Sequence, residues 1–174
     1  NDTNKTAKGQ TLTEERKAQG SSSSAAPPQD QLNHLLVHYQ ANRLEEAEEL
    51  ATLLTQQFPN HPFAWKVLGV VFQQTGRLSE SLAPKKKAAE LSPQDAEAHS
   101  NLGNTLQELR RLEEAEASHG RAIALKPDYT EAHYNLGITL KELGRLNEAE
   151  ASYRKAIALK SDDAKAHNNL GVTL

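Results

Sequence analysis

The chain has 174 residues, of which 25% are charged, a formal net charge of −3, and neither cysteine nor methionine. The absence of cysteine excludes disulfides, thiolate metal sites and thiol nucleophiles. The basic residues are dispersed, so the basic patch of a nucleic-acid-binding protein is missing, and no apolar run approaches the ~18 residues of a membrane span. Asn1 begins no signal-peptide pattern. We therefore expect a cytoplasmic chain with no nucleic-acid or membrane partner, whose true start was trimmed or lies upstream.

Residues 1–27 contain no aromatic residue and one large aliphatic residue, Leu12. Such a segment buries too little apolar surface to offset the entropy of ordering it. Residues 21–28 are a run of serine, alanine and proline, which is typical of a flexible linker. We predict that residues 1–27 form a disordered tail.

From residue 28 onward the sequence repeats with a period of 34 residues. Aligning residues 96–129 with 130–163 gives identity at 23 of 34 positions, and His99, His133 and His167 lie 34 residues apart. Within each unit, apolar residues recur at helical spacing on both sides of a turn, which predicts a helix–turn–helix array. We place the units at 28–61, 62–95, 96–129 and 130–163, followed by a partial unit at 164–174.

The first two units depart from the later ones. Leu35 stands where later units have glycine, so the first helix is expected to lie farther from its partner. Asn42 stands at the first turn, where asparagine tolerates a left-handed conformation. In the second unit, Pro84 removes a backbone hydrogen bond and is expected to bend the second helix. The basic run at residues 85–87 is expected to lie in solvent on the outer face.

In the third unit, Arg110 replaces the turn glycine and His119 replaces the tyrosine found at Tyr153, and each change is expected to weaken the unit locally. Asp128 and Glu131 have the spacing of a capping arrangement at a helix start. In the last, partial unit, Leu170 and Leu174 are expected to remain uncovered or to pack on another molecule, because a repeat cannot bury its apolar face alone. We therefore expect a fragment of a longer array.

The second unit carries the clearest signature: Trp65, then Leu68–Gly69, the aromatic Phe72, the turn residue Gly76 and the closing Pro93. This pattern resembles the tetratricopeptide repeat (TPR) family over residues 28–174. The resemblance implies an all-α fold, a right-handed α-solenoid whose first helices line a concave groove.

One position on the groove side holds asparagine in four of the five units. An amide side chain offers an acceptor and two donors, which match a peptide backbone. The Asn-Leu-Gly run of units three to five resembles the TPR superhelix of O-GlcNAc transferase, which implies an asparagine ladder that binds extended peptides. The alternative is that these amides cap or bridge neighbouring helices and bind nothing. Val67 breaks the ladder, and the candidate peptide-binding residues are Asn33, Asn101, Asn104, Asn135, Asn169, Lys141 and Lys165.

Two other binding modes fit less well. A carboxylate clamp for chaperone C-termini would use Ser100, Asn104, Asn135, Lys165 and Asn169, but this set lacks two of the clamp's cations and much of their charge-assisted hydrogen bonding. The histidines that recur every 34 residues occupy the position of Trp65, a packing site, and equivalent helices about 10 Å apart are too far apart to share one zinc ion. We expect no metal, no cofactor and no catalytic site.

The function that we expect is a protein- or peptide-binding scaffold. Two alternatives remain open at this point. The array resembles the N-terminal arms of larger bacterial glycosyltransferases or sulfotransferases, where it would recruit substrates. It would alternatively self-associate through the truncated C-terminal helix.

Overall fold

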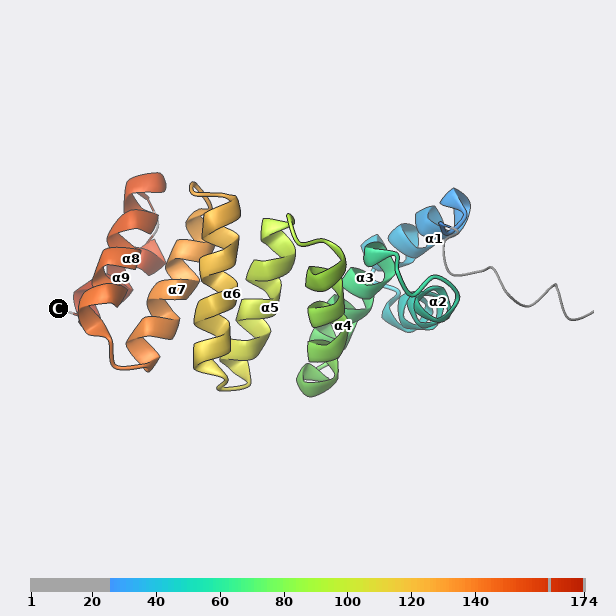
Figure 1. Cartoon of the computed structure of the whole chain (residues 1–174), viewed down its shortest axis with the longest axis horizontal. Helices are drawn as coiled ribbons and strands as arrows, with labels where there is room; N and C mark the ends of the chain where they lie inside the picture. Colours follow the sequence, from blue (N-terminus) through green and yellow to red (C-terminus); the bar gives the residue numbers. More distant parts are fainter. Residues whose placement is uncertain (1–25, 163, 174) are drawn as a thin grey trace, which may run out of the picture.

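The computed structural model describes residues 26–162 and 164–173, so the predicted disordered tail lies almost entirely outside the described residues. Within these ranges the chain forms nine α-helices and no strand, arranged in one row from α1 to α9 (Figure 1). The odd helices α3, α5, α7 and α9 begin at residues 62, 96, 130 and 164, the first residues that we propose for units two to five. The helices are α1 (Gln29–Gln40), α2 (Leu44–Gln57), α3 (Pro62–Gln74), α4 (Leu78–Leu91), α5 (Ala96–Glu108), α6 (Leu112–Leu125), α7 (Thr130–Glu142), α8 (Leu146–Leu159) and α9 (Ala164–Thr173).

Each helix packs against the next one along the chain, and some helices two apart also touch. These second contacts join the odd helices, at α1/α3, α5/α7 and α7/α9, whereas the even helices of the described chain make no comparable contact with one another. Odd helices therefore lie on the inner side of the array and even helices on the outer side. The predicted all-α solenoid is confirmed.

The spacing within each helix pair is set by two residues 16 positions apart. A Cβ atom placed on Gly137 would lie 2.6 Å from the Tyr153 ring, and one on Gly103 would lie 2.6 Å from the His119 ring. Only glycine leaves room for these rings, because real Cβ atoms do not approach so closely. In the first helix pair the large and small residues change places, because the large residue, Leu35, is on the odd helix. As predicted, α1 packs less closely against α2 than the later odd helices pack against their partners.

A second recurring contact ties each odd helix from α3 onward to the preceding turn. The Trp65 indole nitrogen donates a hydrogen bond to the carbonyl of Pro59, six residues earlier, at 2.9 Å. The histidines at the equivalent position bond through Nε2 to the carbonyls of Pro93, Pro127 and Ser161 at 3.3, 2.9 and 2.9 Å. Because a carbonyl only accepts, each Nε2 carries a proton and has no lone pair for a metal. The packing interpretation of these histidines therefore fits their geometry.

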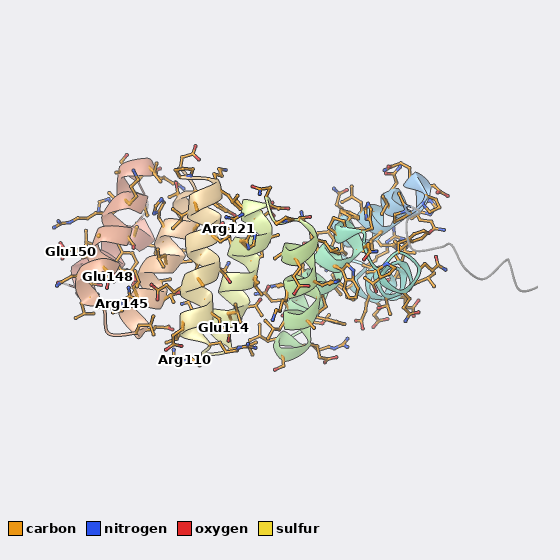
Figure 2. The ribbon with its side chains drawn as sticks, viewed as in Figure 1. Arg110, Glu114, Arg121, Arg145, Glu148 and Glu150 are labelled. Carbon is orange, nitrogen blue, oxygen red and sulfur yellow. The ribbon has the colours of Figure 1, made fainter. Side chains whose placement is uncertain are left out.

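Ion pairs lie at the starts of the even helices α4, α6 and α8. Arg77 contacts Glu48 at 2.7 Å, and Arg145 contacts Glu116 and Glu148, each at 2.6 Å. Figure 2 labels Arg145 and Glu148 near the C-terminal end of the array. The pairs to Glu48 and Glu116 bridge α2 to the start of α4 and α6 to the start of α8. Pairs as exposed as these contribute little to stability, because water and salt screen them.

Three sequence predictions concern the ends of helices. Arg110, with φ 62°, and Asn42, with φ 55°, both adopt the left-handed conformation expected at the turns. The predicted cap at Asp128 and Glu131 is wrong, because Tyr129 occupies the N-cap position of α7 and makes no side-chain cap hydrogen bond. A true cap starts α5, where the side chain of Asp95 accepts from the Ala98 amide at 3.1 Å.

Two predictions concern individual helices. α4 runs through Pro84, which is buried, and the bend predicted there stays a prediction. The expectation that Leu170 is left uncovered is wrong, because it packs against the cluster of Leu140, Ala149 and Tyr153. Leu174 lies outside the described residues, and the exposed apolar side chain of α9 is instead Val172, which is 66% exposed.

The strained turn at Arg110 yields a stability prediction. Replacing Arg110 by glycine removes a left-handed conformation that costs a non-glycine residue about 1–2 kcal/mol, but it also removes an exposed 2.9 Å ion pair with Glu142. We expect Arg110→Gly to raise the free energy of unfolding by about 0.5–1 kcal/mol in urea titrations followed by circular dichroism. The reverse change at the matched turn, Gly144→Arg, should be destabilising; equal effects of the two changes would contradict this account.

His119 makes the array sensitive to acid. It is fully buried, neither ring nitrogen has a partner in the described part of the chain, and burial lowers its pKa to about 4. The unfolded chain binds the proton near pH 6.5 and the folded chain only near pH 4, so stability falls as the pH drops through that window. Between pH 7 and 4.5 the loss should be about 2–3 kcal/mol.

The matched variant is His119→Tyr, which copies the Gly137–Tyr153 pairing of the next unit. We expect its unfolding free energy to lose that part of the acid sensitivity, in urea titrations at both pH values. If the variant and the parent lose the same stability on acidification, His119 does not set the pH dependence.

Candidate functional site

A pocket of about 270 Å³ opens on the inner side of the array, between α1, α3 and α5. Residues of α4 also contribute to its lining. Its lining is mainly apolar with a few charged groups: Leu36, Tyr39, Phe63, Lys66, Val67, Val70, Lys85, Ala88, Glu97, Ala98 and Asn101.

The break in the asparagine ladder coincides with this pocket. Val67 holds the ladder position in α3, is buried, and lines the pocket together with the buried Ala98 of α5. On the α1 side, Leu36 lines the same pocket and is 38% exposed. The inner face of the second unit therefore presents an apolar hollow where the third to fifth units present an amide.

The expectation that residues 85–87 lie in solvent is wrong for Lys85. This residue is 4% exposed, and its ammonium donates hydrogen bonds to the Thr105 hydroxyl at 2.7 Å and to the Gln73 side-chain carbonyl. The reason is its position 16 residues after Gly69, the same relation that Tyr153 has to Gly137. Its Cγ lies 2.6 Å from where a Cβ on Gly69 would be.

The Lys85 ammonium belongs to a small polar network that joins three helices. Burial lowers the pKa of Lys85 to about 8, and the carboxylate of Glu108 acts in the opposite direction. Glu108 is itself linked to Lys85 through Gln73, whose amide donates to Glu108 at 3.0 Å. The network therefore holds α3, α4 and α5 together behind the pocket.

The rim of the pocket carries two residues of opposite charge, Lys66 and Glu97, which differ in whether they form an ion pair. Lys66 of α3 forms an ion pair with Asp95, the cap of α5. Burial raises the pKa of Asp95, but the hydrogen bonds from Lys66 and from the Ala98 amide outweigh it and hold the pKa below its usual range. Glu97 is exposed and its carboxylate has no ion-pair partner among the described residues. The uncompensated charge at the rim is negative.

The predicted ladder residues differ in what their amides do. Asn135 donates to Asn104 at 2.7 Å, so the structure brings these two candidates together across α5 and α7. Asn169 donates to the Tyr134 hydroxyl at 2.8 Å, and Asn33 accepts from Gln29 at 3.1 Å. Asn101 is half-buried at the pocket, and its amide has no hydrogen-bond partner within the described ranges. The amides of Asn135 and Asn169 therefore bridge neighbouring helices, whereas the amide of Asn101 forms no such bridge in the described chain. Peptide binding by these residues stays a prediction.

The cationic candidates and the clamp set lie elsewhere. Lys141 is half-buried in the last turn of α7, and Lys165 is exposed at the start of α9; neither lines the pocket. Ser100, which the clamp arrangement would need in the groove, is fully buried. The clamp is therefore incompatible with this chain at its first position.

Sequence reasoning missed most of the pocket. Val67 was identified only as a break, and Leu36, Phe63 and Val70 were not considered. Two signals were available: valine at the ladder position, and a lysine at the position where Tyr153 faces glycine. Their joint meaning depends on which side chains of α1, α3, α4 and α5 meet at the pocket, and no sequence pattern indicates that.

Sequence comparison places these repeats in a known family. Models described as "Tetratricopeptide repeat" match residues 32–96 and 86–117, and a model described as "TPR repeat" matches residues 108–144 and 139–174. The chain belongs to the tetratricopeptide repeat family. No curated protein sequence matches it.

Several solved structures share the fold at low sequence identity. MamA from Desulfovibrio magneticus RS-1 has a TM-score of 0.77 at 20% identity, with 83% of this chain and 82% of MamA covered. YrrB, described as a TPR protein with an unusual peptide-binding site, has a TM-score of 0.76 at 24% identity, with 82% and 74% covered. The first TPR of Spaghetti (RPAP3), bound to the HSP90 peptide SRMEEVD, has a TM-score of 0.63 at 23% identity, with 64% and 89% covered.

None of the described helices combines the length and apolar character needed to cross a membrane.

The network behind the pocket predicts an alkaline gain in stability. The folded chain loses the Lys85 proton near pH 8 and the unfolded chain near pH 10.5, so the penalty for burying the ammonium disappears as the pH rises through that window. We expect Lys85→Met, which keeps an unbranched apolar stem beside Gly69, to remove this contribution. The difference in unfolding free energy between the two proteins should change by about 2 kcal/mol between pH 7.5 and 10. A constant difference would show that Lys85 titrates as an exposed lysine.

Proposed function

We propose that this chain is a protein-interaction scaffold whose inner side binds an extended peptide segment. The family membership supports an interaction role, and two structures with the same fold, YrrB and RPAP3, are described with a peptide-binding site and a bound peptide. The observation that carries the proposal for this chain is local: a half-buried amide without a partner, that of Asn101, borders an apolar pocket on the inner side.

The chemistry of recognition follows from these two features. The Asn101 amide donates to a peptide carbonyl and accepts from a peptide N–H, which fixes the main chain without reading its sequence. The pocket beside it receives a side chain from the same peptide. Asn135 and Asn104 extend the polar strip towards the C-terminus with the hydrogen-bonding capacity that their mutual bond leaves over.

The proposed division of roles differs from an even ladder. Asn101 is the principal peptide contact, because it breaks no internal bond on binding. Asn169 and Asn33 already bond within the chain and contribute less. A recruitment arm of a larger transferase and self-assembly through α9 stay predictions from the sequence.

The test is the Asn101→Ala variant, screened against an unbiased array of extended peptides. Loss of two backbone hydrogen bonds of about 0.5–1.5 kcal/mol each should weaken the bound peptides roughly 5- to 150-fold. The matched control is Asn147→Ala, at an exposed site on α8, which should bind like the parent. Circular dichroism checks that helicity is unchanged.

Two results would argue against this function. One is a parent protein that retains no peptide from the array. The other is equal binding by the parent and by Asn101→Ala, which would make the inner amides purely structural.

A further inference from the structure

We propose that the pocket between α1, α3 and α5 selects peptides in which one bulky apolar side chain stands beside a basic residue. This inference rests on the proposed function and names the class of partner for the same groove. It follows from the size of the pocket, the state of its polar groups and the charge at its rim.

The size of the pocket suits one side chain. Pockets for drug-sized ligands span about 300–1,000 Å³, and this one measures about 270 Å³. Its walls come from Leu36 and Tyr39 on one side and Phe63 and Val70 on the other. Leu36 keeps 38% of its surface exposed, and an apolar side chain in the pocket would remove that surface from water.

The polar group at the inner end of the pocket is already occupied. The Lys85 ammonium donates to Gln73 and Thr105, which leaves at most one of its three N–H groups for a ligand. A charged or amide side chain entering the pocket would therefore lose its water for at most one replacement hydrogen bond. An aromatic or large aliphatic side chain carries no such cost.

The rim sets the charge of the neighbouring residue. Lys66 is neutralised by Asp95, whereas Glu97 has no ion-pair partner in the described part of the chain. A lysine or arginine next to the apolar residue would therefore be attracted to Glu97, and an acidic residue there would be repelled. The chain's net charge of −3 acts in the same direction.

The experiment uses three peptides that share one Gly/Ser/Thr host sequence and differ at two adjacent positions: Phe-Lys, Ser-Lys and Phe-Glu. Their affinities for the full chain are measured by fluorescence polarisation. We expect Phe-Lys to bind at least tenfold tighter than Ser-Lys and severalfold tighter than Phe-Glu at low salt.

Two variants assign these preferences to the pocket. Val70→Glu, on the half-buried pocket wall, should abolish the advantage of Phe over Ser. Glu97→Lys, at an exposed rim position, should reverse the preference between Phe-Lys and Phe-Glu. The control Asn147→Ala should leave both preferences intact, and circular dichroism monitors the fold of each variant.

The outcomes separate this inference from the proposed function. If Ser-Lys binds as tightly as Phe-Lys and Asn101→Ala still weakens both, peptide binding stands and the pocket selectivity is overturned. If no peptide binds the parent protein, both are overturned. A dimer in size-exclusion chromatography that Val70→Glu dissociates would also overturn the inference, because it would assign the pocket to a second copy of the chain.

Discussion

The array depends on one steric constraint, the fit between a glycine on each of α3, α5 and α7 and a large residue 16 positions later on the following even helix. Gly103 receives the His119 ring and Gly137 receives the Tyr153 ring, at distances that no other residue type on the odd helix would allow. The constraint does not specify which large residue is used. The chain places an aromatic ring, an imidazole and a lysine in this role, with different consequences.

Lysine at this site turns a packing contact into a polar junction. The stem of Lys85 fills the space beside Gly69, and its ammonium needs acceptors that a ring would not need. Gln73 of α3 and Thr105 of α5 supply them, so the two odd helices are linked through a side chain of α4. The direct hydrogen bond from Gln73 of α3 to Glu108 of α5 completes this junction beside the pocket.

Much of this fold was predictable because its determinants recur at fixed spacing. The period of 34, the helix pairs, the left-handed turn residues and the packing role of the histidines all follow from residues in register. The cap at Asp128 was mispredicted because N-cap identity depends on one position, and Tyr129 occupies it. Lys85 was misplaced because charge suggested solvent, whereas its register with Tyr153 indicated burial.

The candidate site was less predictable, because it depends on which side chains bond to one another across units. A row of asparagines looks uniform in the sequence, yet Asn135 bonds to Asn104, Asn169 bonds to Tyr134, and Asn101 has no partner in the part of the chain that is described. The difference arises from the neighbours: Asn104 stands 31 positions before Asn135, whereas the residue 31 positions before Asn101 is Val70 of α3, and valine offers no hydrogen bond. Val70 also lines the pocket beside Asn101 with an apolar side chain, so amide and pocket are best understood as one site.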